Sequence, residues 1–225
     1  MKPARRMVAW TGLIVAAAAF LVAALWVPDG PSEADLLDPV LREAIPGWLG
    51  AGLDALNLLG GLPAWIALVV LAAALVWSSR RLVAAVIGSS ILIEALTTVV
   101  RIAVDRPRPP LGVNTELIVA AGFPSGHVAR SVVFMAAVLV VLPWARRHRP
   151  TWLAISILVV GLMCLARIHA AAHYASDTLA GVLVAAALVA AWSLLRDPEA
   201  EAESEAPRGA TGWAAREGQR EVRRS

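Results

Sequence analysis

Long apolar runs alternate with short polar stretches along most of the chain. There are six such runs, covering residues 7–27, 62–77, 82–104, 128–142, 151–165 and 178–195. An α-helix rises about 1.5 Å per residue and the hydrocarbon core of a bilayer is about 30 Å thick, so about 20 apolar residues span it. The pattern therefore predicts an all-α, polytopic membrane protein with six transmembrane helices. The fourth and fifth runs are short for a full crossing, which would place the polar residues at their outer ends slightly below the membrane surface.

The composition supports a membrane protein and argues against a soluble domain, a nucleic-acid-binding protein and a zinc-binding protein. Apolar residues make up 59% of the 225 residues and the mean hydropathy is +0.69, far above what a soluble domain shows. The net charge of +3 comes from basic residues in small groups between the apolar runs, which favours membrane topology over a nucleic-acid partner. Cys164 is the only cysteine, so the sequence contains neither an intrachain disulfide nor a cluster with zinc-ligand spacing.

The chain divides into a membrane domain and a charged tail. We expect residues 1–195 to form the six-helix domain and residues 196–225 to form a disordered cytoplasmic extension; a role of its basic end at the lipid surface is the alternative. Basic residues precede the first run as in a secretory signal, but its length and the lack of a small-x-small cleavage site beside Pro28 favour a retained anchor. Residues 39–59 mix apolar and polar positions and suggest a helix along the outer interface.

Basic residues in the short loops predict the orientation. They precede the first run, join the second to the third and join the fourth to the fifth: Lys2, Arg5, Arg6, Arg80, Arg81, Arg146, Arg147 and Arg149. Positive loops face the cytoplasm, so both termini should be cytoplasmic in a multi-pass protein of the cell membrane. The stretch 28–61 carries six acids and a single base, Arg42, and should be external. The motifs described next fall on this external side.

Three polar motifs lie at the edges of the apolar runs. They read Arg101-x6-Arg108-Pro109, Pro124-Ser125-Gly126-His127, and Arg167-x5-His173-x3-Asp177. Ionisable residues are costly at membrane depth and usually functional there. If the stretch from His173 to Asp177 is helical, the carboxylate can accept the Nδ1 proton of the imidazole and leave Nε2 free as a nucleophile. A lone histidine near an apolar helix is more often structural, but the aspartate and the arginines favour catalysis.

The second motif precedes the fourth apolar run and suits an anion. The backbone amides of a Ser125-Gly126 turn at a helix N-terminus point outward, and the helix dipole favours negative charge there. The Ser125 hydroxyl adds a hydrogen-bond donor, and His127 can protonate a leaving oxygen. Ser125 could instead act as a helix N-cap, and the two roles are compatible.

Arginines complete the predicted phosphate site. The forked guanidinium groups of Arg101, Arg108 and Arg167 suit the equatorial oxygens of a phosphoryl group. Arginines in a loop can instead anchor a protein at the lipid surface, and for Arg106 this alternative is open. By spacing alone, two charged residues inside apolar runs are candidate supporting groups: Arg130 for the site and Glu94 for Arg101.

The order and spacing of the motifs resemble the type 2 phosphatidic acid phosphatase superfamily, whose signature is Lys-x6-Arg-Pro, then Pro-Ser-Gly-His, then Ser-Arg-x5-His-x3-Asp. The resemblance spans residues 82–195, and the second motif matches completely. Arg101 stands where the family usually has lysine, and Ala166 stands where it usually has serine. Arginine keeps the charge in a broad planar fork and alanine removes one possible phosphate donor. Both departures bear on headgroup preference more than on the chemistry.

The resemblance implies a metal-independent phosphatase without a cofactor, built as a helical bundle. In this pattern His173 attacks phosphorus and forms a phosphohistidine, Asp177 orients it, and His127 protonates the leaving lipid oxygen. The phosphoryl oxygens would be held by the remaining motif residues: Arg101, Arg108, Ser125, Gly126 and Arg167.

The leading hypothesis is a lipid phosphatase acting at the external face. The first choice of substrate is a polyprenyl diphosphate such as undecaprenyl diphosphate, because an outward-facing site suits recycling of a lipid carrier; phosphatidic acid and phosphatidylglycerol phosphate are alternatives. A lipid phosphotransferase with the same site is a second hypothesis. A non-enzymatic transporter of anionic lipids is a third, although transport does not require the pair of His173 and Asp177.

Overall fold

The computed structural model describes residues 3–26, 35, 38–110 and 120–195, and this part of the chain is helical with no β-strand. The helices are α1 (Pro3–Trp26), α2 (Asp38–Ala44), α3 (Gly47–Gly60), α4 (Leu62–Leu75), α5 (Arg80–Val104), α6 (Gly126–Val141), α7 (Pro143–Arg147), α8 (Arg149–His169) and α9 (Ala175–Leu195). The all-α prediction is confirmed. The predicted tail, residues 196–225, lies outside the described residues.

Several helices are suited to a bilayer. Within the described residues α1, α5, α8 and α9 are long and apolar enough to cross it; α3 and α4 would form a fifth span if joined across their bend of 64°, and α6 is a shorter apolar helix. Large side chains such as Leu25, Val99 and Ile157 are exposed on these helices, as expected where lipid covers the surface. The chain is a multi-pass membrane protein, and the number of six crossings stays a prediction.

Two regions differ from the predicted runs. The helix that contains the fifth run is not short, because α8 extends over Arg149–His169. It continues through the polar residues at both ends of the run, so the length of the run underestimates the length of the helix. The expected interfacial helix at residues 39–59 is two helices, α2 and α3, with Pro46 between them. Proline disfavours a helical conformation in the residue before it, so the chain turns there.

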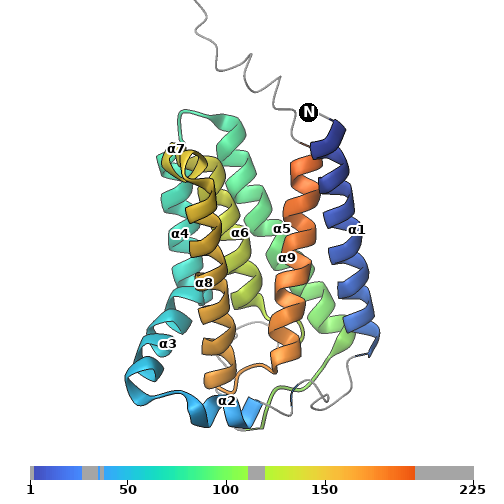
Figure 1. Cartoon of the computed structure of the whole chain (residues 1–225), viewed down its shortest axis with the longest axis vertical. Coiled ribbons are helices and arrows are strands. Elements are labelled where there is room, and N and C mark those ends of the chain that lie inside the picture. Colours follow the sequence, from blue (N-terminus) through green and yellow to red (C-terminus); the bar gives the residue numbers. More distant parts are fainter. Residues whose placement is uncertain (1–2, 27–34, 36–37, 111–119, 196–225) are drawn as a thin grey trace, which may run out of the picture.

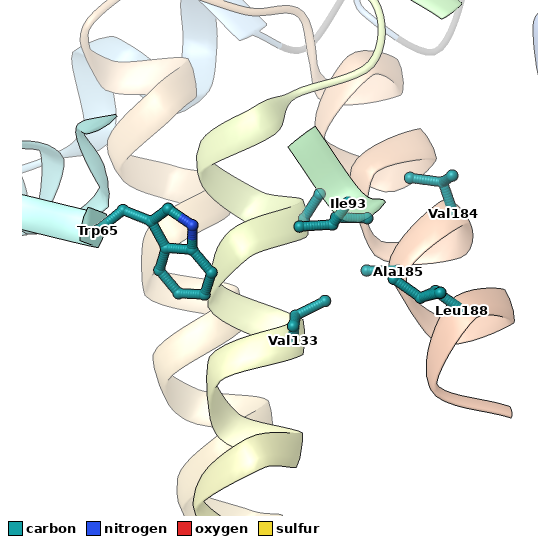
Figure 2. Close-up of a cluster of buried hydrophobic side chains, with 7 residues drawn as sticks. Trp65, Ile93, Val133, Val184, Ala185 and Leu188 are labelled. Atoms are coloured by element: carbon teal, nitrogen blue, oxygen red, sulfur yellow. The ribbon is translucent and has the colours of Figure 1, made fainter. Parts of the chain in front are cut away.

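α6 lies at the centre of the bundle, with α4, α5, α8 and α9 packed against it (Figure 1). In the buried cluster of Figure 2, Trp65 of α4 lies on one side of α6 and Val184 of α9 on the other. Ala129 and Ala185 are fully buried in the same cluster, and such small side chains let helices approach closely. This packing holds the first turn of α6 against the first turns of α9.

The helix ends that carry the motifs gather at one end of the bundle. α5 and α8 run toward the end where α2 and α3 lie, whereas α6 and α9 begin there, and the start of α1 lies at the opposite end (Figure 1). The antiparallel order of the helices therefore brings three sequence-distant motifs into one region, which we call the site end.

Candidate active site

Nearly all the predicted site side chains are buried. His173 and Asp177 are fully buried, and the exposed fractions of Arg101, Ser125, His127 and Arg167 are 4% or less. Arg108 is half-buried. Buried polar and charged groups are costly unless they are hydrogen-bonded or paired. The contacts of each side chain therefore indicate what this region can do.

His173 is held in one tautomer by a backbone carbonyl. It lies just before α9, and its Nδ1 is 2.7 Å from the carbonyl oxygen of Gly122. Because a carbonyl only accepts, Nδ1 carries the proton and Nε2 carries the lone pair. Arg108 Nη1 is 3.2 Å from Nε2, so a guanidinium lies beside the nitrogen that carries the lone pair.

Asp177 does not form the expected hydrogen bond with His173. Its Oδ2 is 3.7 Å from His173 Nδ1, which is too long for a hydrogen bond. Oδ2 instead accepts the backbone N–H of Tyr174 at 2.9 Å. The prediction assumed a helix from His173 onward, whereas α9 begins at Ala175, and a carboxylate in the first turn reaches back to the free N–H before the helix.

The start of α6 is the predicted anion site. Ser125 is the N-cap residue, but its side chain makes no cap hydrogen bond, and its Oγ is buried without a hydrogen-bond partner among the described residues. Its backbone N–H donates to the carbonyl oxygen of Asp177 at 2.9 Å. The N-cap alternative is therefore not used, and the hydroxyl remains available as a donor next to the first amides of α6.

Arg101 lies directly over this helix start. Its Nε donates to the carbonyl oxygen of Pro124 at 3.1 Å. A Cβ added to Gly126 would lie 2.5 Å from Arg101 Nη2 and 3.4 Å from Arg130 Nη2. Only glycine leaves room for a guanidinium this close, and two positive groups beside a helix N-terminus favour an anion.

Arg108 is fixed by three carbonyl groups. Its Nε donates to Ala120 O at 2.7 Å, its Nη2 to Ala121 O at 3.2 Å and its Nη1 to Ala172 O at 2.9 Å. These bonds tie the segment after α5 to the segment before α9. The guanidinium is therefore oriented toward His173 before any ligand arrives.

Helix α3 contributes contacts that the sequence interpretation missed. Arg167 Nη1 donates to Asn57 Oδ1 at 3.2 Å, and Asn57 Nδ2 donates to Ala166 O at 3.1 Å. A Cβ added to Gly60 would lie 2.7 Å from His127 Cδ2, so the end of α3 packs against this imidazole. Asn57 and Gly60 belong to no motif, and only the packing of α3 places them here.

Arg106 is not a surface anchor. It is 1% exposed, and its Nη1 donates to Asp177 Oδ1 at 2.5 Å while its Nη2 donates to Asp35 Oδ2 at 2.9 Å. Burial raises the pKa of the Tyr174 hydroxyl, so this residue stays neutral, and its ring lies 4.5 Å from the guanidinium carbon of Arg106. The sequence interpretation missed Asp35, because nothing in the sequence after α1 signals a contact with α9.

Glu94 pairs with Arg130 and not with Arg101. Both oxygens of Glu94 accept from the Arg130 guanidinium, by a short contact with Nε and at 3.2 Å with Nη2. Arg130 Nη1 also donates to Gly60 O at 2.9 Å. Two turns of helix separate Glu94 from Arg101 by about 10 Å, whereas Arg130 approaches from α6. Arg130 thereby joins α5, α6 and the bend between α3 and α4.

The sequence profile of the PAP2 superfamily matches residues 82–200, more than half of the 225 residues. The chain belongs to the PAP2 superfamily. Its fold is similar to that of the first transmembrane PAP2 type phosphatidylglycerolphosphate phosphatase from Bacillus subtilis, with a TM-score of 0.69, 18% identity, and coverage of 82% of this chain and 97% of that chain. The chain therefore has a PAP2 membrane phosphatase fold. The comparison with curated proteins found no match.

Two departures from the usual PAP2 signature now have a structural setting. Arg101 donates to the Pro124 carbonyl through Nε while its Nη2 lies beside the start of α6, so different nitrogens of the planar fork serve the two positions, where a lysine has a single ammonium. Ala166 is fully buried, and its backbone carbonyl accepts from Asn57, which also contacts Arg167. An amide from α3 therefore lies next to the position where the superfamily usually has a serine hydroxyl.

Proposed function

We propose that this PAP2 protein hydrolyses a lipid phosphate through a phosphohistidine at His173. The observation that carries the proposal is the orientation of this imidazole, with Nδ1 2.7 Å from Gly122 O and Nε2 3.2 Å from Arg108 Nη1. A nucleophilic nitrogen of defined tautomer beside a cation suits attack on phosphorus. A transporter of anionic lipids would need the arginines but not this orientation.

The reaction proceeds in two steps. The Nε2 lone pair of His173 forms a bond to phosphorus while the bond from phosphorus to the lipid oxygen breaks, and His127 transfers its proton to that oxygen. A water molecule then attacks the phosphohistidine and gives its proton to His127. The bond from phosphorus to Nε2 breaks, inorganic phosphate leaves, and both histidines return to their starting states.

The phosphoryl oxygens are stabilised by donors at the start of α6 and around it. The Gly126 amide and Ser125 Oγ lie at the helix N-terminus, where the dipole favours negative charge. The guanidinium groups come from three segments of the chain and complete the site: Arg101, Arg108 and Arg167. Such preorganised donors act where charge develops in the transition state.

We assign the site to the extracytoplasmic face and a polyprenyl diphosphate as the first choice of substrate. The site end lies opposite the start of α1 (Figure 1), and the basic residues around that start predict a cytoplasmic position for it. Trp48 and Leu58 of α3 are 79% and 77% exposed at the site end, as suits a helix lying in the headgroup region. Phosphatidic acid and phosphatidylglycerol phosphate are the alternative substrates. The latter appears in the name of the Bacillus subtilis protein of similar fold.

A phosphate-release panel tests the proposal. Purified protein in detergent micelles is incubated with polyprenyl diphosphate, phosphatidic acid and phosphatidylglycerol phosphate, with and without a chelator. Wild type should release phosphate from one of them in either condition, because the two steps use histidines and arginines and no metal. His173→Ala should lose the activity, whereas His148→Ala, an exposed histidine beyond α7, should retain it.

Three outcomes would contradict parts of the proposal. Release by His173→Ala at the wild-type rate would rule out the phosphohistidine. Loss of activity in the chelator would contradict the metal-independent mechanism. Transfer of the phosphate to a second lipid, with none released, would identify a phosphotransferase.

A further inference from the structure

Arg106 joins two carboxylates that come from opposite parts of the chain. Its Nη2 donates to Asp35 Oδ2 at 2.9 Å, and its Nη1 donates to Asp177 Oδ1 at 2.5 Å and to Ser176 Oγ at 2.7 Å. The side chains of Arg106, Asp35 and Asp177 are completely buried. One guanidinium therefore compensates two carboxylates in a region closed to solvent, where its planar fork can reach both.

Asp35 holds the start of α9 as well as Arg106. Its Oδ1 accepts the backbone N–H of Ser176 at 2.9 Å, and its Oδ2 accepts Ser176 Oγ at 3.0 Å. Helix N-termini have free N–H groups that a carboxylate stabilises. Asp35 thus connects the segment after α1 to the first turn of α9, and Arg106 completes the connection to Asp177.

The backbone of Arg106 is also linked to His173. The carbonyl oxygen of Arg106 accepts the N–H of Gly122 at 2.7 Å, and the carbonyl oxygen of Gly122 accepts Nδ1–H of His173. A Cβ added to Gly122 would lie 3.2 Å from Asp177 Oδ2, so Gly122 packs closely against Asp177 as well as bonding to Arg106 and His173. The orientation of the imidazole therefore depends on where Arg106 is held.

We propose that Arg106 is a positioning residue for His173, and that Asp35 acts through Arg106. This inference rests on the proposed phosphatase reaction. The buried guanidinium does not contact the substrate. It fixes the Gly122 carbonyl, which accepts from His173, and Asp177, which holds the backbone N–H of the next residue, Tyr174. Removing the fork lets the imidazole move from its productive position, and a displacement of about 1 Å can lower the rate by about 100-fold.

Four proteins test this role: wild type, Arg106→Gln, Asp35→Asn and the double variant. We expect kcat to fall about 10- to 100-fold in Arg106→Gln and less in Asp35→Asn. KM and the inhibition constant of inorganic phosphate should change by less than about threefold in both variants. Arg108→Gln serves as the comparison, because loss of a substrate-binding arginine should raise both constants. The double variant should be no slower than Arg106→Gln alone, because Asp35→Asn keeps an oxygen for the Ser176 N–H and loses the charge that pairs with Arg106.

Each other result would overturn the inference. Independent, multiplicative losses in the double variant would show that Asp35 does not act through Arg106, and a large rise in the phosphate inhibition constant would make Arg106 a phosphate ligand. If Arg106→Gln does not fold, as judged by gel filtration and melting, Asp35→Asn alone decides, and a wild-type kcat contradicts the role. An inactive wild type refutes the proposed function, whereas an active wild type with an equally active Arg106→Gln refutes only this inference.

Discussion

A methyl group added at Gly181 should push the start of α6, which carries Ser125 and His127, away from the start of α9. Gly181 lies in the second turn of α9, where a Cβ would be 2.5 Å from the backbone oxygen of Ser125 and 3.3 Å from Val128 Cβ. Ordinary contact begins at 3.4 Å, so Gly181→Ala requires a separation of about 0.9 Å, the difference between 3.4 and 2.5 Å. A backbone oxygen cannot rotate away, so α6 and α9 must move apart.

This movement should lower the catalytic rate strongly while lowering the stability of the fold only moderately. The bond between the Ser125 N–H and Asp177 O, now 2.9 Å, would lengthen, and His127 on α6 would move away from His173 before α9. A displacement of about 1 Å can cost about 100-fold in rate, and overpacking typically costs about 1–3 kcal/mol of stability. We therefore expect a folded protein with a lower melting temperature and a kcat about 100-fold below wild type.

The assay is phosphate release by purified protein in detergent, with melting followed by tryptophan fluorescence. Gly161→Ala on α8 is the matched control, because a Cβ there meets nothing within 4 Å; its activity should be that of wild type and its stability equal or higher, since alanine is favoured over glycine in a helix by about 1 kcal/mol. A Gly181→Ala protein with wild-type kcat and melting temperature would refute the reasoning.

Two further predictions concern His127 of the site and Asp38 in the first turn of α2. His127→Ala should lower kcat/KM, which reports the step that releases the lipid, by about 10²- to 10⁴-fold for a lipid phosphomonoester and less for a lipid diphosphate, whose leaving lipid phosphate needs less protonation. Equal losses of kcat/KM on both substrates would contradict its role as general acid. Burial raises the pKa of the Asp38 carboxyl above its ordinary value of 3.8. A carboxyl group whose pKa is raised by folding stabilises the folded protein at pH values below its ordinary pKa. That contribution is lost as the pH rises through the raised pKa. Asp38→Asn, which keeps an oxygen for the Ala175 N–H, should therefore melt above wild type at pH 7, with a gain that shrinks as the pH falls toward 4, and a gain independent of pH would contradict this.

The apolar runs predict most of the helices, but they do not predict where each helix begins and ends. The run at 151–165 marks α8, yet this helix extends over Arg149–His169 because polar residues continue a helix that the bundle supports. Pro46 divides α2 from α3, and this break follows from local stereochemistry. The break between α3 and α4 is local as well, because Gly61 and Pro63 stand there. Its angle of 64° depends on the packing of α3 against α6 and α8, which the sequence pattern does not contain.

The residue types of the candidate site were visible in sequence, whereas their partners were not. The spacing of His173 and Asp177 suggested a direct hydrogen bond, but the start of α9 at Ala175 assigns that carboxylate to Tyr174 N–H and Arg106. Helical spacing predicts that Glu94 supports Arg101 on its own helix, and the structure pairs it with Arg130 of α6. Spacing along a helix describes only neighbours on that helix, and buried charges in a bundle pair across helices.

The sequence by itself determined the membrane class, the helical fold, the order of the three motifs and the PAP2 resemblance, because hydrophobic periodicity and short motifs are local properties. Tertiary structure alone decided that Gly122 O orients His173, that Asn57 of α3 meets Arg167, and that Asp35 reaches Arg106. Each of these contacts joins segments far apart in the chain. They arise because buried polar groups must find partners wherever the packing of the helices places them.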